Sequence, residues 1–100
     1  MAYRLSWSAR GLAELQATLD YVAVDAPANA QSIARLALQK AEALQDQPRQ
    51  GRKLPENTGP REIREVFVFR WRLIYEVAGE TVTILALHHS ARLLDNVPPL

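Results

Sequence analysis

The sequence predicts one α+β domain, in which an N-terminal strand and an antiparallel helical hairpin are followed by a three-stranded antiparallel sheet, in the order β-α-α-β-β-β. Three features lead to this fold class. Apolar residues recur at helical spacing in the first half, a segment rich in proline and glycine follows, and the remainder has a period of two. A length of 100 residues suits a single domain, residues 1–100, with one hydrophobic core.

The chain opens with a predicted strand and a first helix. The segment AYRLSW alternates apolar and polar residues, which indicates a strand over about Ala2–Ser6. From Ser8, whose hydroxyl can cap the free N–H groups of a first turn, the spacing predicts a helix that ends near Val24. The apolar stripe of this helix consists of Leu12, Leu15, Leu19 and Val22.

A second helix is predicted from Pro27 to Gln45. Proline is tolerated in a first turn, because its missing N–H would have no partner there. The apolar positions are Ala30, Ile33, Ala37, Ala41 and Leu44. The alanines favour a helix and allow a neighbour to approach closely, so we expect the two helices to pack as an antiparallel hairpin.

The second half predicts a connecting loop and three strands. The segment Asp46–Arg61 holds three prolines and two glycines, which indicates a loop. Strands are then predicted over about Arg61–Val68, Trp71–Val77 and Thr81–His88, where β-branched and aromatic residues are dense, and short turns make neighbouring strands antiparallel. Both faces carry apolar residues, so we expect a partner to cover the face away from the helices.

Composition narrows the class of protein. A hydrophobic content of 48% and a charged content of 23% are typical of a globular domain. The net charge of +1 is far from that of a nucleic-acid-binding domain, although seven of the twelve basic residues lie between Arg49 and Arg72. There is no cysteine, no signal peptide and no apolar stretch of membrane-spanning length, so we expect a cytoplasmic protein without membrane attachment or cofactor.

Three motifs follow one another along the chain: P-x-x-G-R, then R-E-aliphatic with a later aromatic-R-aliphatic-aliphatic-Y, and finally a strand that ends in leucine and histidine with an arginine nearby. They lie at Pro48–Arg52, Arg64–Tyr75 and Leu87–Arg92. With these motifs the chain resembles, over nearly its whole length, the RelE/ParE superfamily of bacterial type II toxin–antitoxin toxins. Trp71 is a departure, because the family usually has tyrosine there.

The resemblance implies one of two activities. RelE-like members are ribonucleases that cut messenger RNA in the ribosome with Lys, Arg, His, Glu or Tyr side chains, whereas ParE-like members share the fold but poison DNA gyrase. Both are neutralised by an antitoxin whose C-terminal segment wraps the toxin.

A ribonuclease needs a base, an acid and cations that stabilise the phosphorane charge. The candidates for this chemistry are Arg64, Arg72, Tyr75, Arg92 and one histidine, either His88 or His89. Adjacent strand residues point to opposite faces, so His88 and His89 cannot both reach one phosphate, and a structural role is favoured for the histidines. Ser90 is interpreted as a turn or cap residue, and the ligand set for a metal site is incomplete.

Arg64 and Arg72 are expected to lie near one another on adjacent strands, where like charges need compensation from Glu62, Glu65 or Glu76. A pair of salt-bridged arginines is favoured over direct contact with a target or an antitoxin, and both remain open. The loop residues Arg49, Arg52 and Lys53 are interpreted as a solvated basic surface.

The charge also favours one branch. Affinity for the ribosome should come from many Lys and Arg contacts to phosphate, and this chain has only two lysines. We therefore expect a ParE-like, non-enzymatic toxin that inhibits DNA gyrase, does not read nucleic acid sequence, and forms a hetero-oligomer with a ParD-like antitoxin. The residues expected to contact target or antitoxin are Arg52, Arg64, Arg72, Tyr75, His88 and Arg92.

Two alternatives remain open, namely a ribosome-dependent endoribonuclease and a non-toxic antitoxin-binding module. The apolar tail Leu93–Leu100 is expected to fold back over the sheet or the hairpin, or to be buried under a partner.

Overall fold

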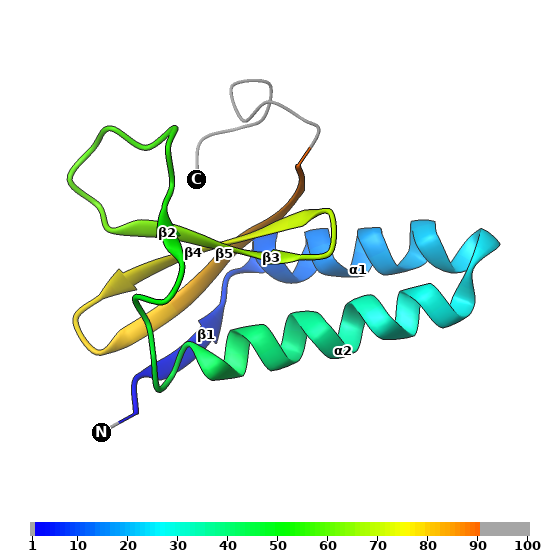
Figure 1. Cartoon of the computed structure of the whole chain (residues 1–100), viewed down its shortest axis with the longest axis horizontal. Coiled ribbons are helices and arrows are strands. Elements are labelled where there is room, and N and C mark those ends of the chain that lie inside the picture. Colours follow the sequence, from blue (N-terminus) through cyan, green and yellow to red (C-terminus); the bar gives the residue numbers. More distant parts are fainter. Residues whose placement is uncertain (1, 91–100) are drawn as a thin grey trace.

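The computed structural model describes residues 2–90 and confirms the predicted α+β fold with its β-α-α-β-β-β order (Figure 1). The elements are β1 (Arg4–Trp7), α1 (Ala9–Asp25), α2 (Pro27–Ala43), β2 (Arg52–Lys53), β3 (Ile63–Val68), β4 (Trp71–Ala78) and β5 (Thr81–His89). The one additional element is β2, which lies inside the predicted loop and is too short to show a periodic pattern. The other bounds agree with prediction to within two residues.

The sheet has five strands rather than three. Its order is β1-β5-β4-β3-β2, and the three predicted C-terminal strands form its antiparallel centre. Strand β1 adds to one edge, parallel to β5, and β2 adds to the other, antiparallel to β3. Strand β1 pairs with a segment that is distant in sequence, and β2 pairs through only two residues. Local sequence patterns therefore could not predict either pairing.

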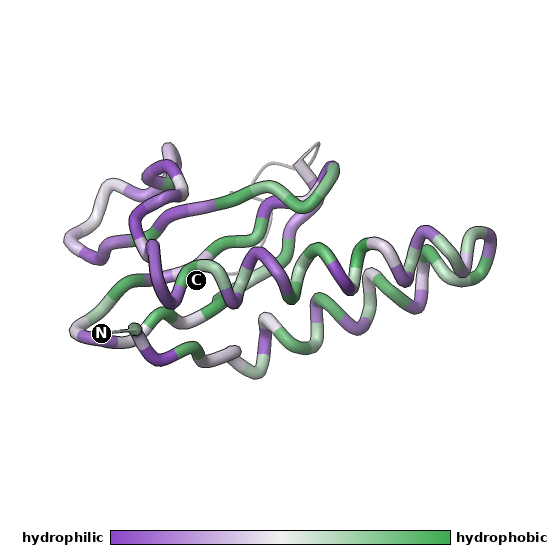
Figure 2. The backbone as a smooth tube through the Cα atoms, turned by 60° about the horizontal axis from the view of Figure 1, so that its bottom comes forward, coloured by the Kyte–Doolittle hydropathy of each residue, from purple (hydrophilic) through white to green (hydrophobic). Residues whose placement is uncertain are grey.

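Both helices begin at residues that favour a helix N-terminus. The hydroxyl of Ser8 accepts a hydrogen bond from the N–H of Gly11 and caps α1, as predicted. Pro27 lies in the first turn of α2. Hydrophobic and hydrophilic residues alternate along both helices (Figure 2), and the far end of the hairpin extends beyond the sheet (Figure 1). Within residues 2–90, neither helix is long and apolar enough to cross a bilayer.

The main core lies between the helical hairpin and the inner face of the sheet, which we define as the face toward the helices. It is formed by Leu15, Ile33, Ala37, Ala41, Leu44, Val68, Leu73, Tyr75, Val77, Val82, Ile84 and Leu87. The many alanines of α2 let the helix approach the sheet closely, as expected from their small volume.

The opposite, outer face is covered partly by the chain itself. Leu54, in the loop after β2, packs with Ile63, Ile74 and Ala86 in a second apolar cluster. The expectation that a partner must cover this face was therefore wrong for its central part. This face is covered by a loop residue, and neither the loop sequence nor the strand pattern has a periodicity that could predict the contact.

Candidate functional site

A β-bulge in β5 decides which face each histidine occupies. Ile74 pairs with Ala86 but Tyr75 pairs with Ile84, so Leu85 is an extra residue on β5. Beyond this bulge, His88 is opposite Arg72 on the outer face, where it is 4% exposed. Without the bulge, a strict period of two from Val82 would have placed His88 on the inner face.

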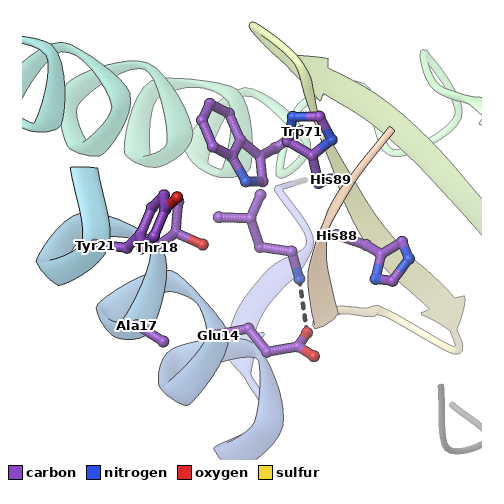
Figure 3. Close-up of a pocket in the computed structure, with 8 residues that line it drawn as sticks. Glu14, Ala17, Thr18, Tyr21, Trp71, His88 and His89 are labelled. Atoms are coloured by element: carbon purple, nitrogen blue, oxygen red, sulfur yellow. Dashed lines mark hydrogen bonds between the residues drawn. The ribbon is translucent and has the colours of Figure 1, made fainter. Parts of the chain in front are cut away.

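His89 takes the other side, as predicted from the period of two. It is opposite Trp71, and the two rings meet edge to face with their centroids 5.3 Å apart. Figure 3 shows the two histidine rings directed away from each other. The two imidazoles therefore do not face a common point.

Helix α1 holds the bulged part of β5. The carboxylate of Glu14 accepts a hydrogen bond of 3.0 Å from the backbone N–H of Leu87 (Figure 3, dashed line), and the hydroxyl of Ser8 donates to the carbonyl of Leu85 at 3.2 Å. The other carboxylate oxygen of Glu14 accepts from Arg10 at 3.2 Å. Glu14 was not singled out from sequence, because it lies off the apolar stripe of the helix and its partner on β5 is 73 residues away along the chain.

An ion network occupies the outer face. The side chain of Glu65 is fully buried and accepts hydrogen bonds from both Arg52 and Arg72. The two terminal nitrogens of Arg72 also donate hydrogen bonds to the carboxylate oxygens of Glu56, at 2.8 and 2.7 Å. Hydrogen bonding to Glu56 raises the pKa of the Arg72 guanidinium, and the same bonds lower the pKa of Glu56. Two guanidinium groups thus meet two carboxylates.

Arg64 and Arg72 do not lie near one another, contrary to expectation. Arg64 pairs with Tyr75, whereas Arg72 pairs with Phe67, so their side chains leave opposite faces of the sheet. Tyr75, the partner of Arg64, lies three residues from Arg72 on β4, and an odd separation along a strand places two side chains on opposite faces. Arg64 donates to Glu62 at 2.9 Å and to the carbonyl of Gly51 at 2.8 Å.

Two of the three predicted carboxylates, Glu62 and Glu65, compensate the charges of Arg64 and Arg72 as expected, whereas Glu76 pairs with another arginine. Glu62 serves Arg64 and Arg49, Glu65 serves Arg72 and Arg52, and Glu76 binds Arg61 through two hydrogen bonds of 2.9 Å. All three residues of the expected solvated cluster, Arg49, Arg52 and Lys53, are exposed. Arg49 and Arg52 are ion-paired as well, to Glu62 and Glu65 respectively.

Tyr75 fixes the P-x-x-G-R loop rather than presenting a surface. It is completely buried, its hydroxyl donates to the carbonyl of Pro48 at 2.8 Å, and the N–H of Gly51 donates to it at 3.0 Å. Burial raises the pKa of this phenol. A Cβ at Gly51 would lie 2.5 Å from both the Tyr75 hydroxyl and the Glu65 carbonyl. The motif residues Pro48, Gly51, Arg64 and Tyr75 therefore clamp one loop to the sheet.

A groove of about 560 Å³ lies between α1 and the adjoining ends of β4 and β5 (Figure 3). Its lining residues are Glu14, Ala17, Thr18, Tyr21, Trp71, Leu87, His88 and His89. Among residues 2–90, no group of three or more His, Asp or Glu side chains is placed to hold a metal ion. Arg92 and the tail Leu93–Leu100, for which roles were predicted, lie outside the described residues.

Comparison with known proteins agrees with this architecture. The model of a family described as "ParE toxin of type II toxin-antitoxin system, parDE" matches residues 5–94. The chromosomal ParDE toxin–antitoxin system from P. aeruginosa contains a chain with a TM-score of 0.71 and 22% identity, over 88% of this chain and 96% of that one.

The archaeal RelE–RelB complex from Pyrococcus horikoshii OT3 contains a chain with a TM-score of 0.65 and 23% identity, over 93% of this chain and 100% of that one. At these identities the solved structures establish the fold alone. No curated protein sequence matches the chain.

Proposed function

Because the chain belongs to the ParE toxin family of type II toxin–antitoxin systems, we propose that it arrests growth by inhibiting DNA gyrase and is held inactive by a ParD-like antitoxin. In this proposal the chain performs no chemistry of its own. It binds gyrase and stabilises the state in which the enzyme holds cleaved DNA, in the cytoplasm where gyrase and antitoxin meet.

Gyrase is favoured over messenger RNA as the target because the candidate catalytic arginines are paired with carboxylates. Arg72 is 6% exposed and donates to two carboxylates, and Arg52 shares one of them. Catalysis of RNA cleavage needs cations that are available to the phosphorane, and Glu56 and Glu65 would repel that charge. The buried position of His88 and the opposite orientation of His89 further support a binding surface rather than a nuclease site.

We propose that Arg52, Arg72 and His88 shape the outer face that meets the target, with Arg92 beyond the end of β5 contributing to the same contact. Arg64 and Tyr75 would act indirectly, because they hold the P-x-x-G-R loop against the sheet. Their substitution should therefore weaken binding through misplacement of the loop rather than through a lost contact.

An antitoxin is proposed to cover apolar side chains that the helical hairpin leaves exposed. Tyr21 and Val24, near the end of α1, are 80% and 81% exposed, and Leu12 and Leu38 are about half exposed. Both comparison structures come from toxin–antitoxin systems, ParDE in one and RelE–RelB in the other. A segment that lays an apolar face along the hairpin would follow the helix-in-groove mode of peptide recognition.

Purified chain added to a DNA supercoiling reaction and to a translation reaction tests the target. We expect supercoiling to stop and cleaved DNA to accumulate, while messenger RNA stays intact. Ribosome-dependent cuts in messenger RNA with normal supercoiling would overturn the proposal and favour the endoribonuclease. No effect in either reaction, and no growth arrest in cells, would identify a non-toxic antitoxin-binding module.

A further inference from the structure

A second concavity, of about 510 Å³, lies on the other side of the P-x-x-G-R loop, between β2, β3 and the loop that joins them. We call it the basic pocket. Its lining residues are Arg49, Lys53, Leu54, Asn57, Thr58, Gly59, Pro60, Arg61, Glu62, Ile63 and Arg64. Four of these side chains are cationic and only one, Glu62, is anionic, so the wall of the pocket differs in charge from the paired network on the outer face.

Positive charge is in excess in this pocket even after its ion pairs are counted. Glu62 is shared between Arg49 and Arg64, so one carboxylate meets two guanidinium groups. The side chain of Lys53 forms no hydrogen bond or ion pair with any of residues 2–90, and Arg61 is neutralised by Glu76. The excess amounts to two positive charges, although the whole chain has a formal charge of +1.

The pocket is also held in place before any ligand arrives. Arg61 is fixed by two hydrogen bonds to Glu76, and its carbonyl accepts from the side chain of Asn57 at 2.8 Å. Arg64 is fixed by Glu62 and by the carbonyl of Gly51. Guanidinium groups held in this way lose little conformational freedom when an anion binds, which favours affinity.

We propose that the basic pocket binds a phosphate group, either in the backbone of a nucleic acid or in a free polyphosphate. Planar guanidinium groups match the geometry of phosphate oxygens, and Lys53, whose ammonium group has no partner among residues 2–90, supplies a further donor. The concavity is small and mainly polar, with Leu54 and Ile63 already buried in the second apolar cluster, so it offers little apolar surface to a peptide. The proposal is independent of gyrase.

Lysine side-chain NMR of the full chain tests this directly, because the only lysines are Lys53, in the pocket, and Lys40, in the last turn of α2. Sodium pyrophosphate is titrated at constant ionic strength. We expect a saturable shift of the Lys53 ε-methylene signal and none of the Lys40 signal. If neither signal moves, or both move equally without saturation, the pocket is not a phosphate site.

Matched variants give the second measurement. Lys53→Gln and Lys40→Gln remove the same charge, and neither lysine side chain forms a hydrogen bond or ion pair with any of residues 2–90. We expect pyrophosphate affinity to fall about tenfold for Lys53→Gln, as for one charge-assisted contact, and to stay unchanged for Lys40→Gln. Equal affinities for the two variants would contradict the proposal.

A short DNA duplex and an oligoglutamate peptide distinguish the sources. If the duplex binds more tightly than pyrophosphate, and Lys53→Gln reduces the slope of log affinity against log salt by about one, the natural ligand is a nucleic acid backbone. Binding of pyrophosphate without the duplex identifies a free polyphosphate. Tighter binding of oligoglutamate than of either phosphate ligand would overturn the proposal in favour of an acidic peptide. None of these readouts involves gyrase, so their failure leaves the proposed toxin activity intact.

Discussion

Glu14, on helix α1, accepts a hydrogen bond from the backbone N–H of Leu87, on strand β5, at 3.0 Å. Strand β1 pairs with β5 only as far as Ile84, and beyond that point the start of α1 replaces it as the partner of β5. The bulge at Leu85 lies at this changeover. The bulge sets the face of His88, and the start of α1 is hydrogen-bonded to β5 at this bulge and just beyond it.

Glu14→Leu is expected to lower the free energy of unfolding by about 1–3 kcal/mol, because it removes the acceptor of a partly buried N–H. Glu14→Gln keeps an acceptor oxygen and should lose less. Urea denaturation measures the stability, and hydrogen exchange at the amide of Leu87 reports the local bond. Unchanged stability together with unchanged protection of Leu87 in Glu14→Leu would contradict the role assigned to this carboxylate.

Gly51→Ala is expected to destabilise the chain by about 1–3 kcal/mol, as overpacking does, because its Cβ would lie 2.5 Å from the Tyr75 hydroxyl and from the Glu65 carbonyl. Gly59→Ala is the matched control, since its Cβ would meet only the Asn57 side chain at 3.7 Å. Thermal unfolding of both variants provides the comparison. Equal melting temperatures would show that the P-x-x-G-R loop is not clamped as described.

Stability should fall in acid through three glutamates. Hydrogen bonds from Arg72, Arg64 and Arg61 hold the pKa values of Glu56, Glu62 and Glu76, respectively, below the ordinary value of 4.5. A lowered folded-state pKa stabilises the protein above the unfolded value, and this contribution is lost as pH falls through the folded value. The melting temperature, measured from neutral pH downward, should therefore begin to fall once the pH is lower than about 4.5. Glu76→Gln should show a shallower drop.

Much of the fold was accessible from sequence because its signals are local. The Ser8 cap, the spacing of the helices and the period of two in β3, β4 and β5 each depend on neighbouring residues. The pairing of β1 with β5, the cover supplied by Leu54 and the bond from Glu14 to β5 depend on contacts between distant segments. No periodicity encodes these contacts.

The candidate site was less accessible for a related reason. Faces on a strand follow the period of two only until a bulge interrupts it, and Leu85 looks like any other apolar residue of β5. The separation of His88 from His89 could be predicted, but not which of them faces outward. Likewise, arginines on adjacent strands suggested proximity, while the register that separates Arg64 from Arg72 became known only from the structure.

Single alanine variants of the two histidines test whether either one acts on a target. His89→Ala should lose about 0.5–1.5 kcal/mol of stability with its edge-to-face contact to Trp71, and His88→Ala should be destabilised because the side chain is buried beside Arg72. We expect both variants to arrest growth when expressed without antitoxin, because a gyrase-binding toxin needs no proton transfer from imidazole. His88 is 4% exposed, so in our proposal it shapes the outer face from within and does not touch the target. Plating efficiency gives the readout, with circular dichroism and antitoxin binding as controls for folding. If either variant stays folded and binds antitoxin but no longer arrests growth, that histidine contacts the target directly, and a ribonuclease mechanism through it regains support.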